Sequence, residues 1–146
     1  MKISTRVRYG VRLMLVLALE YGRGQVLLKD ISQRENVSEK YLGQIVIALK
    51  AKGLVSSFRG AKGGYVLAKK PADVSVYEIV RALEGDYNLV ECINNPAQCE
   101  RVSHCLTRDL WHDLEFKIKE TLEDVKLSDL VAKAKKKISK QITYNI

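Results

Sequence analysis

Apolar side chains recur every three or four positions between residues 7 and 18, which predicts an amphipathic helix near the start of the chain. Ser4 can cap its first turn, and the helix runs to about Tyr21 before two glycines end it. A second, shorter helix fits residues 28–35, and Asn36 is its expected stop. Each helix has one apolar face, so each needs a neighbour that covers it.

The third predicted helix separates apolar from polar positions most clearly. Ser38 can cap it, and it extends to about Lys52, where Gly53 supplies a left-handed exit. One stripe is apolar and should face the core, and its members are Leu42, Ile45, Val46 and Leu49. The opposite side carries a different set, which consists of Lys40, Gly43, Gln44 and Ile47.

A β-hairpin follows the third helix, because LVSSF and YVLAK are strand-like and GAKGG between them is typical of a turn. Three helices followed by a hairpin with a basic tip indicate the winged-helix form of the helix-turn-helix. We therefore expect a mainly α fold (α+β) in which residues 1–85 form a winged-helix DNA-binding domain with a two-stranded wing. Its last element is a fourth helix, which begins with a capping box of Ser75 and Glu78 and ends at Gly85.

The C-terminal part predicts a loop and then a long helix. Residues 86–104 lack periodicity, so we expect residues 86–105 to form a cysteine-containing sensor loop. A fifth helix should begin near Cys105, because apolar residues recur at helical spacing through Leu106, Leu110, Leu114, Ile118, Leu122 and Val125. Trp111 and Phe116 add apolar surface beside this stripe.

That apolar face is larger than one neighbour in so small a domain would cover. We therefore expect a homodimer in which the long C-terminal dimerisation helix pairs with its copy. Ser128 can cap a last short helix, which leads into a lysine-rich tail, so residues 106–146 hold the dimerisation helix and a basic end.

The net charge of +8 suits a partner that carries phosphate groups, since basic side chains placed on phosphates release counterions. No stretch approaches the roughly 20 apolar residues of a membrane span, and the first residues show no secretion signal, so we expect a cytoplasmic protein with no membrane partner. We find no Ser/His/Asp set, phosphate-binding glycine loop or carboxylate pair at a plausible cleft spacing, so we expect no enzyme.

Double-stranded DNA admits a helix into its major groove, where residues near the helix N-terminus reach the base edges. Four residues of the third helix occupy that position, namely Ser38, Lys40, Tyr41 and Gln44. Gln44 can contact adenine with both amide atoms, and Lys40 can reach a guanine edge or a phosphate. Two of the four have plainer alternatives, in which Ser38 only caps the helix and Tyr41 only packs beneath it.

The turn of the hairpin offers a second DNA contact. Glycines allow the turn to approach a sugar–phosphate backbone closely, while Arg59 and Lys62 bring positive charge to a minor groove. A glycine-rich turn with two exposed basic residues is the alternative.

Three stretches of the sequence resemble one family of winged-helix regulators, which includes IscR, NsrR and CymR: MKISTRVRYG, VSEKYLGQIVIALKAKGLV and SSFRGAKGGYVLAK. YEIVRALEG and CLTRDLW extend the resemblance to nearly the whole chain. It implies a DNA-binding dimer, with contacts from Ser38, Lys40, Gln44, Arg59 and Gly60. Many relatives carry a glutamate where this chain has Gly43, so the family's choice of operator does not transfer to this chain.

Cys92, Cys99 and Cys105 fall within one segment, which indicates a metal, a cluster or a redox switch rather than a disulfide framework. The resemblance to IscR-like members implies an iron–sulphur cluster (2Fe-2S or 4Fe-4S) on these three thiolates, in a repressor of iron–sulphur or cysteine homeostasis. The family's fourth ligand would fall on Arg108 or Arg8, and neither can ligate. The remaining candidates are His104, Glu91, Glu100 and Asp109.

Three alternatives keep the DNA binding. A CymR-like regulator would work without a cluster, zinc could replace iron with His104 as the fourth ligand, and Cys99 and Cys105 could form a reversible disulfide.

Overall fold

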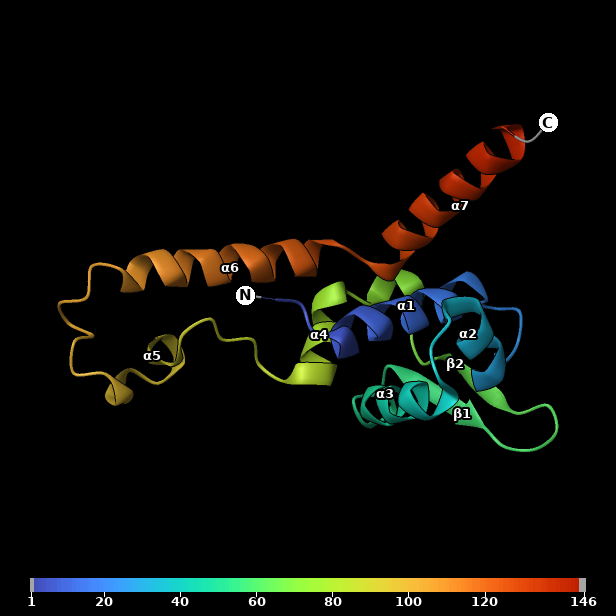
Figure 1. The fold of residues 1–146 in the computed structure, drawn as a ribbon, viewed down its shortest axis with the longest axis horizontal. Coiled ribbons are helices and arrows are strands. Elements are labelled where there is room, and N and C mark those ends of the chain that lie inside the picture. The colour runs from blue at the N-terminus through green and yellow to red at the C-terminus, as the bar shows by residue number, and fades with distance from the viewer. Residues whose placement is uncertain (1, 145–146) are drawn as a thin grey trace.

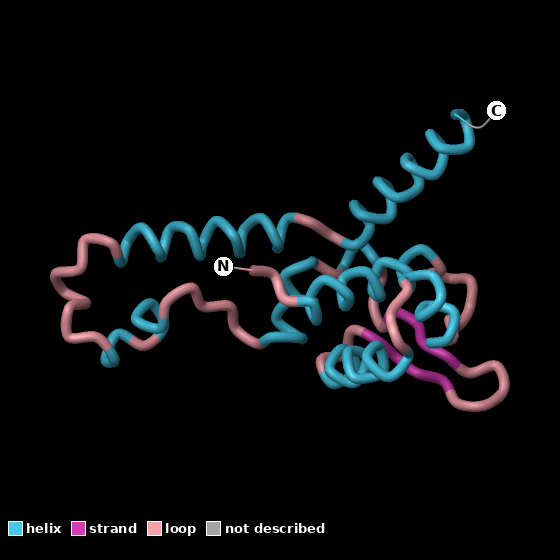
Figure 2. Tube along the Cα trace, viewed as in Figure 1, coloured by secondary structure: helices cyan, strands magenta, loops and turns pink. Residues whose placement is uncertain are grey.

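The computed structural model describes residues 2–144, which form seven α-helices and one two-stranded sheet (Figures 1 and 2). The elements are α1 (Thr5–Leu19), α2 (Leu28–Glu35), α3 (Glu39–Ala51), β1 (Val55–Phe58), β2 (Gly64–Leu67), α4 (Val76–Glu84), α5 (Glu91–Asn94), α6 (Arg108–Asp124) and α7 (Leu127–Tyr144). Two short 3-10 turns, η1 (Pro71–Asp73) and η2 (Pro96–Gln98), lie between them. The expected mainly α winged-helix fold is confirmed.

Helices α1 and α3 begin where their capping residues predict. The Ser4 hydroxyl accepts the N–H of Val7, and the Ser38 hydroxyl accepts the N–H of Tyr41. Asn36 ends α2 in a left-handed conformation, and Gly53 takes the same kind of conformation just after α3. These ends depend on neighbouring residues only, which is why the sequence predicts them.

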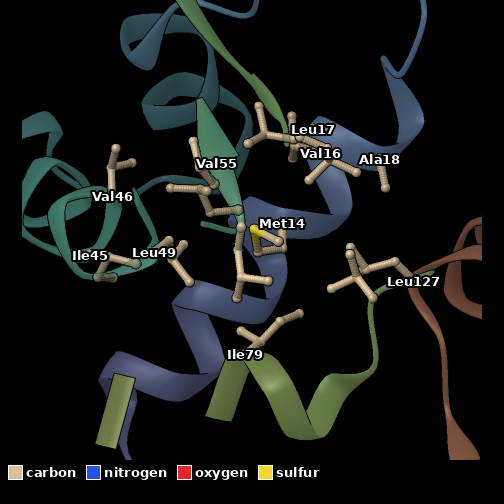
Figure 3. Packing of buried hydrophobic residues seen from close by; sticks show 14 of the residues in the cluster. Met14, Val16, Leu17, Ala18, Ile45, Val46, Leu49, Val55, Ile79 and Leu127 are labelled. Carbon is tan, nitrogen blue, oxygen red and sulfur yellow. The ribbon is translucent and has the colours of Figure 1, made fainter. Parts of the chain in front are cut away.

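The core lies around α1, which touches α2, α3, α4, α7 and β2 (Figure 3). Met14 and Leu13 of α1 are fully buried, and they meet the apolar stripes of α3 and α4, which include Leu49 and Ile79. The apolar stripe of α3 predicted from periodicity is buried throughout.

The wing is an antiparallel pair in which Val55 lies opposite Leu67 and Phe58 lies opposite Gly64. It is tied to the loop before α2, because Val26 and Tyr65 exchange two backbone hydrogen bonds of 2.9 Å. This bridge fixes the wing relative to α2 and α3.

The junction of α6 and α7 is anchored in the core. Leu127 is fully buried and donates its backbone N–H to the carbonyl of Val74 (2.9 Å), while Val76 donates to the carbonyl of Val125 (2.9 Å). Residues 125–127 therefore extend along residues 74–76, directly before α4. Figure 1 shows α6 leaving this junction in one direction and α7 in the other.

Three expectations about the C-terminal part need correction. The fifth predicted helix begins at Arg108, so Leu106 lies outside it and is 94% exposed. Residues 86–104 are not a plain loop, since they contain α5 and η2. The last helix is not short, because α7 has 18 residues and takes in the lysines predicted as a tail.

Candidate nucleic-acid interface and cysteine segment

One side of α3 forms what we call the recognition face, which consists of the exposed Lys40, Gln44 and Ile47 and the half-buried Gly43. These positions share a side because they repeat at spacings of three and four residues. Lys40 and Gln44 are exposed and appear in none of the ion pairs found among the described residues. Their charge and amide group therefore face outward.

Ser38 and Tyr41, both predicted at this interface, have structural roles. The Ser38 hydroxyl is 3.2 Å from the backbone nitrogen of Tyr41 and caps α3. The Tyr41 ring is half-buried and meets Tyr9 edge to face, with ring centres 6.0 Å apart. Arg12 stacks on Tyr9 and also pairs with Glu35 at 2.6 Å, which braces α1 against α2. These contacts hold α3 at a fixed angle to the rest of the domain.

The wing turn places Arg59, Gly60 and Lys62 at an exposed tip. Gly60 has φ of 102°, a left-handed value that favours glycine. Gly63 is also constrained, because a Cβ there would lie 2.9 Å from the carbonyl oxygen of Gly60. The glycines therefore make a tight turn that projects two basic side chains.

The start of α3 and the wing face a common hollow of about 500 Å³. Its lining includes Glu39 of α3, Lys29 of α2 and the wing residues Phe58, Arg59 and Gly60. Figure 1 shows α3 and the wing on one side of the molecule and α6 and α7 on the other. The start of α3 thus lies beside the wing, and Arg59 and Gly60 are the predicted contacts that line the hollow.

The cysteine segment, which we define as residues 86–106, lies at the end of the molecule away from the wing (Figure 1). Cys92 is in α5, Cys99 follows η2, and Cys105 lies just before α6. All three are free thiols with partly exposed side chains. Two contacts tie the segment to α6, since Arg108 donates to the carbonyl of Cys92 (3.3 Å) and Glu115 accepts the backbone N–H of Leu89 (3.0 Å).

The pKa of the Cys105 thiol is lowered, first by its side-chain hydrogen bond with Thr107. The two side-chain atoms are 3.4 Å apart, and backbone hydrogen bonds from Thr107 and Arg108 act in the same direction. Arg108 itself has an unusual position, because its Nε is buried without a hydrogen-bond partner among the described residues.

The thiols suit a soft metal, because thiolates bind iron–sulphur clusters and zinc. Their present arrangement does not form a metal site, since within residues 2–144 no three His, Cys, Asp or Glu side chains lie close enough to hold a metal ion. His104 is exposed and contacts the hydroxyl of Ser103. The cysteine segment would have to close for its thiols to reach one centre.

Two exposed apolar side chains near the predicted DNA contacts have no role that the sequence predicts. Ile47 is 70% exposed in the middle of the recognition face, and Phe58 is half exposed beside Arg59 on the wing. The sequence signal that could have identified Ile47 is its helical spacing from Lys40 and Gln44.

None of the helices in the described range is long and apolar enough to cross a membrane.

Comparison with known proteins gives a consistent result. The model of the Rrf2 family, an iron-dependent transcriptional regulator, matches residues 3–133. CymR of Bacillus subtilis, an HTH-type transcriptional regulator, is 41% identical over 132 residues, which cover 90% of this chain and 91% of CymR. IscR of Vibrio atlanticus is 37% identical over 131 residues, which cover 90% of this chain and 75% of IscR.

Solved structures agree with the sequence relatives. The structure of CymR, the global cysteine regulator of B. subtilis, has a TM-score of 0.77 and covers 90% of this chain and 97% of that one. The structure of T. potens IscR, 37% identical, has a TM-score of 0.76 and covers 92% of this chain and 88% of that one.

Proposed function

The chain belongs to the Rrf2 family of transcriptional regulators, and we propose that it is a homodimeric repressor whose operator binding is controlled by an iron–sulphur cluster on Cys92, Cys99 and Cys105. The observation that carries the DNA-binding part is the recognition face of α3 beside the basic wing. Such a regulator would work in the cytoplasm, in iron–sulphur or cysteine homeostasis.

DNA would be read by the two parts of this surface. We assign base contacts in the major groove to Gln44 and Lys40, with Ser38 and Tyr41 at the edge of the contact and mainly positioning α3. Arg59, Gly60 and Lys62 would enter the adjacent minor groove, where a narrow groove concentrates negative potential. The tight wing turn supports this assignment because it brings backbone as well as charge to the surface.

The homodimer is supported by α6. No residue of this 17-residue helix is buried within one chain, and its exposed apolar side chains include Leu110, Trp111 and Phe116. Burial of apolar area contributes about 25 cal/mol per Å², part of which is offset by the entropy lost on association. Two copies joined through α6 would present two α3 helices, as a palindromic operator with half-sites about 34 Å apart requires.

The cluster, when bound, would supply a redox-active centre held by soft thiolate ligands. The residues of the chain connect that site to the dimer, because the cysteine segment joins α4 to α6 and touches α6 through Arg108 and Glu115. Gathering the three thiols would order this segment and fix the start of α6 relative to α4. The spacing of the two recognition faces would change with it.

The direct test is anaerobic purification followed by visible spectroscopy and analysis of iron, acid-labile sulphide and zinc. We expect a brown protein with iron and sulphide, and loss of both in Cys92→Ala. Asn95→Ala in the same segment is the matched control and should keep them. A colourless protein without iron after reconstitution would remove the cluster from the proposal.

A second candidate function is a CymR-like regulator that binds DNA without a cluster. The relatives support it, since CymR of B. subtilis is 41% identical to this chain and IscR of V. atlanticus is 37% identical.

The same purification distinguishes the zinc site and the disulfide from the cluster. Stoichiometric zinc, lost in His104→Ala, would indicate a zinc site, and a shift on a non-reducing gel after oxidation would indicate a disulfide of Cys99 and Cys105.

A further inference from the structure

Among the described residues of the winged-helix part, Ile47 is the most exposed large apolar side chain, with 70% of its surface accessible. Single exposed apolar residues are ordinary on protein surfaces. Ile47 differs because it lies on the recognition face, on the same stripe of α3 as Lys40 and Gln44. A polar side chain would be expected at such an exposed position. An isoleucine there indicates that this surface contacts an apolar group.

Gly43 supports a contact at this place. A glycine inside a helix costs about 1 kcal/mol relative to alanine. Packing does not require it, because a Cβ at Gly43 would meet only Leu28, at an ordinary 3.8 Å. A missing side chain at this position therefore keeps the surface beside Ile47 open.

The direction of helical side chains brings Ile47 toward Gln44. Side chains lean toward the N-terminus of their helix, so Ile47 lies over the turn that contains Gly43 and Gln44. Gln44 and Ile47 are three residues apart, a rise of about 4.5 Å along the axis. This rise is close to the roughly 3.4 Å step between base pairs, so the two side chains would meet neighbouring pairs.

From these observations we propose that Ile47 is a specificity-determining residue that contacts the C5-methyl group of thymine in the major groove, one base pair from the pair that Gln44 contacts. The thymine methyl is the only apolar group that the bases present in this groove, and aliphatic side chains read it by contact. The inference rests on the proposed DNA binding and adds a preference for thymine at one defined operator position.

The test begins with selection of bound duplexes from a random-sequence library by the wild-type protein. Each thymine of the selected site is then replaced by deoxyuridine, which lacks only the methyl group, and the dissociation constant is measured at fixed salt. We expect about fourfold weaker binding at one thymine of each half-site, the value for one buried carbon. In Ile47→Ala the same replacement should have no effect.

Two variants serve as controls. Ile138→Ala removes another half-exposed isoleucine, from α7 on the other side of the molecule, and should keep the full deoxyuridine effect. Gln44→Ala should weaken adenine discrimination but retain the methyl effect. Circular dichroism checks that each variant is folded.

The outcomes separate the inference from the proposed function. If the wild-type protein selects no sequence, sequence-specific DNA binding fails and the role of Ile47 fails with it. If a sequence is selected but deoxyuridine weakens binding equally in wild type and Ile47→Ala, or in neither, the DNA binding stands and the role of Ile47 is overturned.

Discussion

Two glycines inside helices allow one substitution to be compared in two environments. Gly10 lies in α1 and Gly43 in α3, and alanine is the better helix former at both by about 1 kcal/mol. A Cβ at Gly43 would meet only Leu28, at 3.8 Å. A Cβ at Gly10 would overlap with the buried Leu83 of α4 and lie 3.5 Å from Ile45.

The two environments predict a gain in stability at Gly43 and either no gain or a loss at Gly10. Gly43→Ala should raise the free energy of unfolding by about 1 kcal/mol, which is about 2–4 °C in Tm for a domain of this size. At Gly10 the overlap costs about 1–3 kcal/mol of overpacking, which exceeds or cancels the helix gain. Gly10→Ala should therefore lower the free energy of unfolding by up to about 2 kcal/mol.

Urea unfolding followed by circular dichroism at 222 nm measures both values, with equal m-values as the check that the unfolded states are comparable. If Gly10→Ala were as stable as Gly43→Ala, the close packing of α1 on α4 would be wrong. If Gly43→Ala were destabilising, Gly43 would have a structural role that its surroundings do not indicate.

Four further predictions concern single sites. Arg59→Ala should weaken operator binding by about 1–3 kcal/mol in a gel-shift titration, and unchanged binding would remove it from the interface. Phe116→Glu should convert the proposed dimer to monomer in sedimentation analysis, whereas a dimer would place the interface elsewhere. Burial raises the pKa of Glu78, but hydrogen bonds from Ser75 and the nearby Lys69 outweigh it, so this pKa is lowered from 4.5. The ionised carboxylate therefore stabilises the fold above pH 4.5. There the free energy of unfolding of wild type should exceed that of Glu78→Gln by less than about 1 kcal/mol, and this difference should vanish as the pH falls through the lowered pKa. In metal-free protein Thr107→Val should slow alkylation of Cys105 by iodoacetamide, measured by mass spectrometry, and an unchanged rate would contradict the role of the hydroxyl.

The parts of the fold that the sequence predicts are those fixed by near neighbours. The caps at Ser4, Ser38 and Ser75 use atoms three residues away, and the buried stripe of α3 follows from helical spacing. The helix and the hairpin that carry the predicted DNA contacts follow from the same kind of local signal. Their relative position does not, because it depends on distant contacts such as the Val26–Tyr65 bridge and the Tyr9–Tyr41 ring pair.

The predictions that were wrong concern features that depend on contacts between residues far apart in the sequence. The start of α6 at Arg108 accompanies contacts with Cys92 and Leu89, which belong to another part of the chain. The long α7 depends on the docking of Leu127 into a core built by α1 and α4. The sequence does not predict the fourth metal ligand for the same reason, because ligands separated in sequence are brought together only by the folded chain or by a second copy of it.

The backbone pairing of residues 125–127 with residues 74–76 has a consequence for how such a protein could change over evolution. It closes the winged-helix core without help from residues 86–106, because the chain returns to the core at Leu127 whatever path it takes in between. The cysteine segment and α6 thus lie in one excursion of the chain that leaves the core after α4 and returns at Leu127. Changes in residues 86–106 would therefore leave the core pairing, and the position of α3 and the wing, in place.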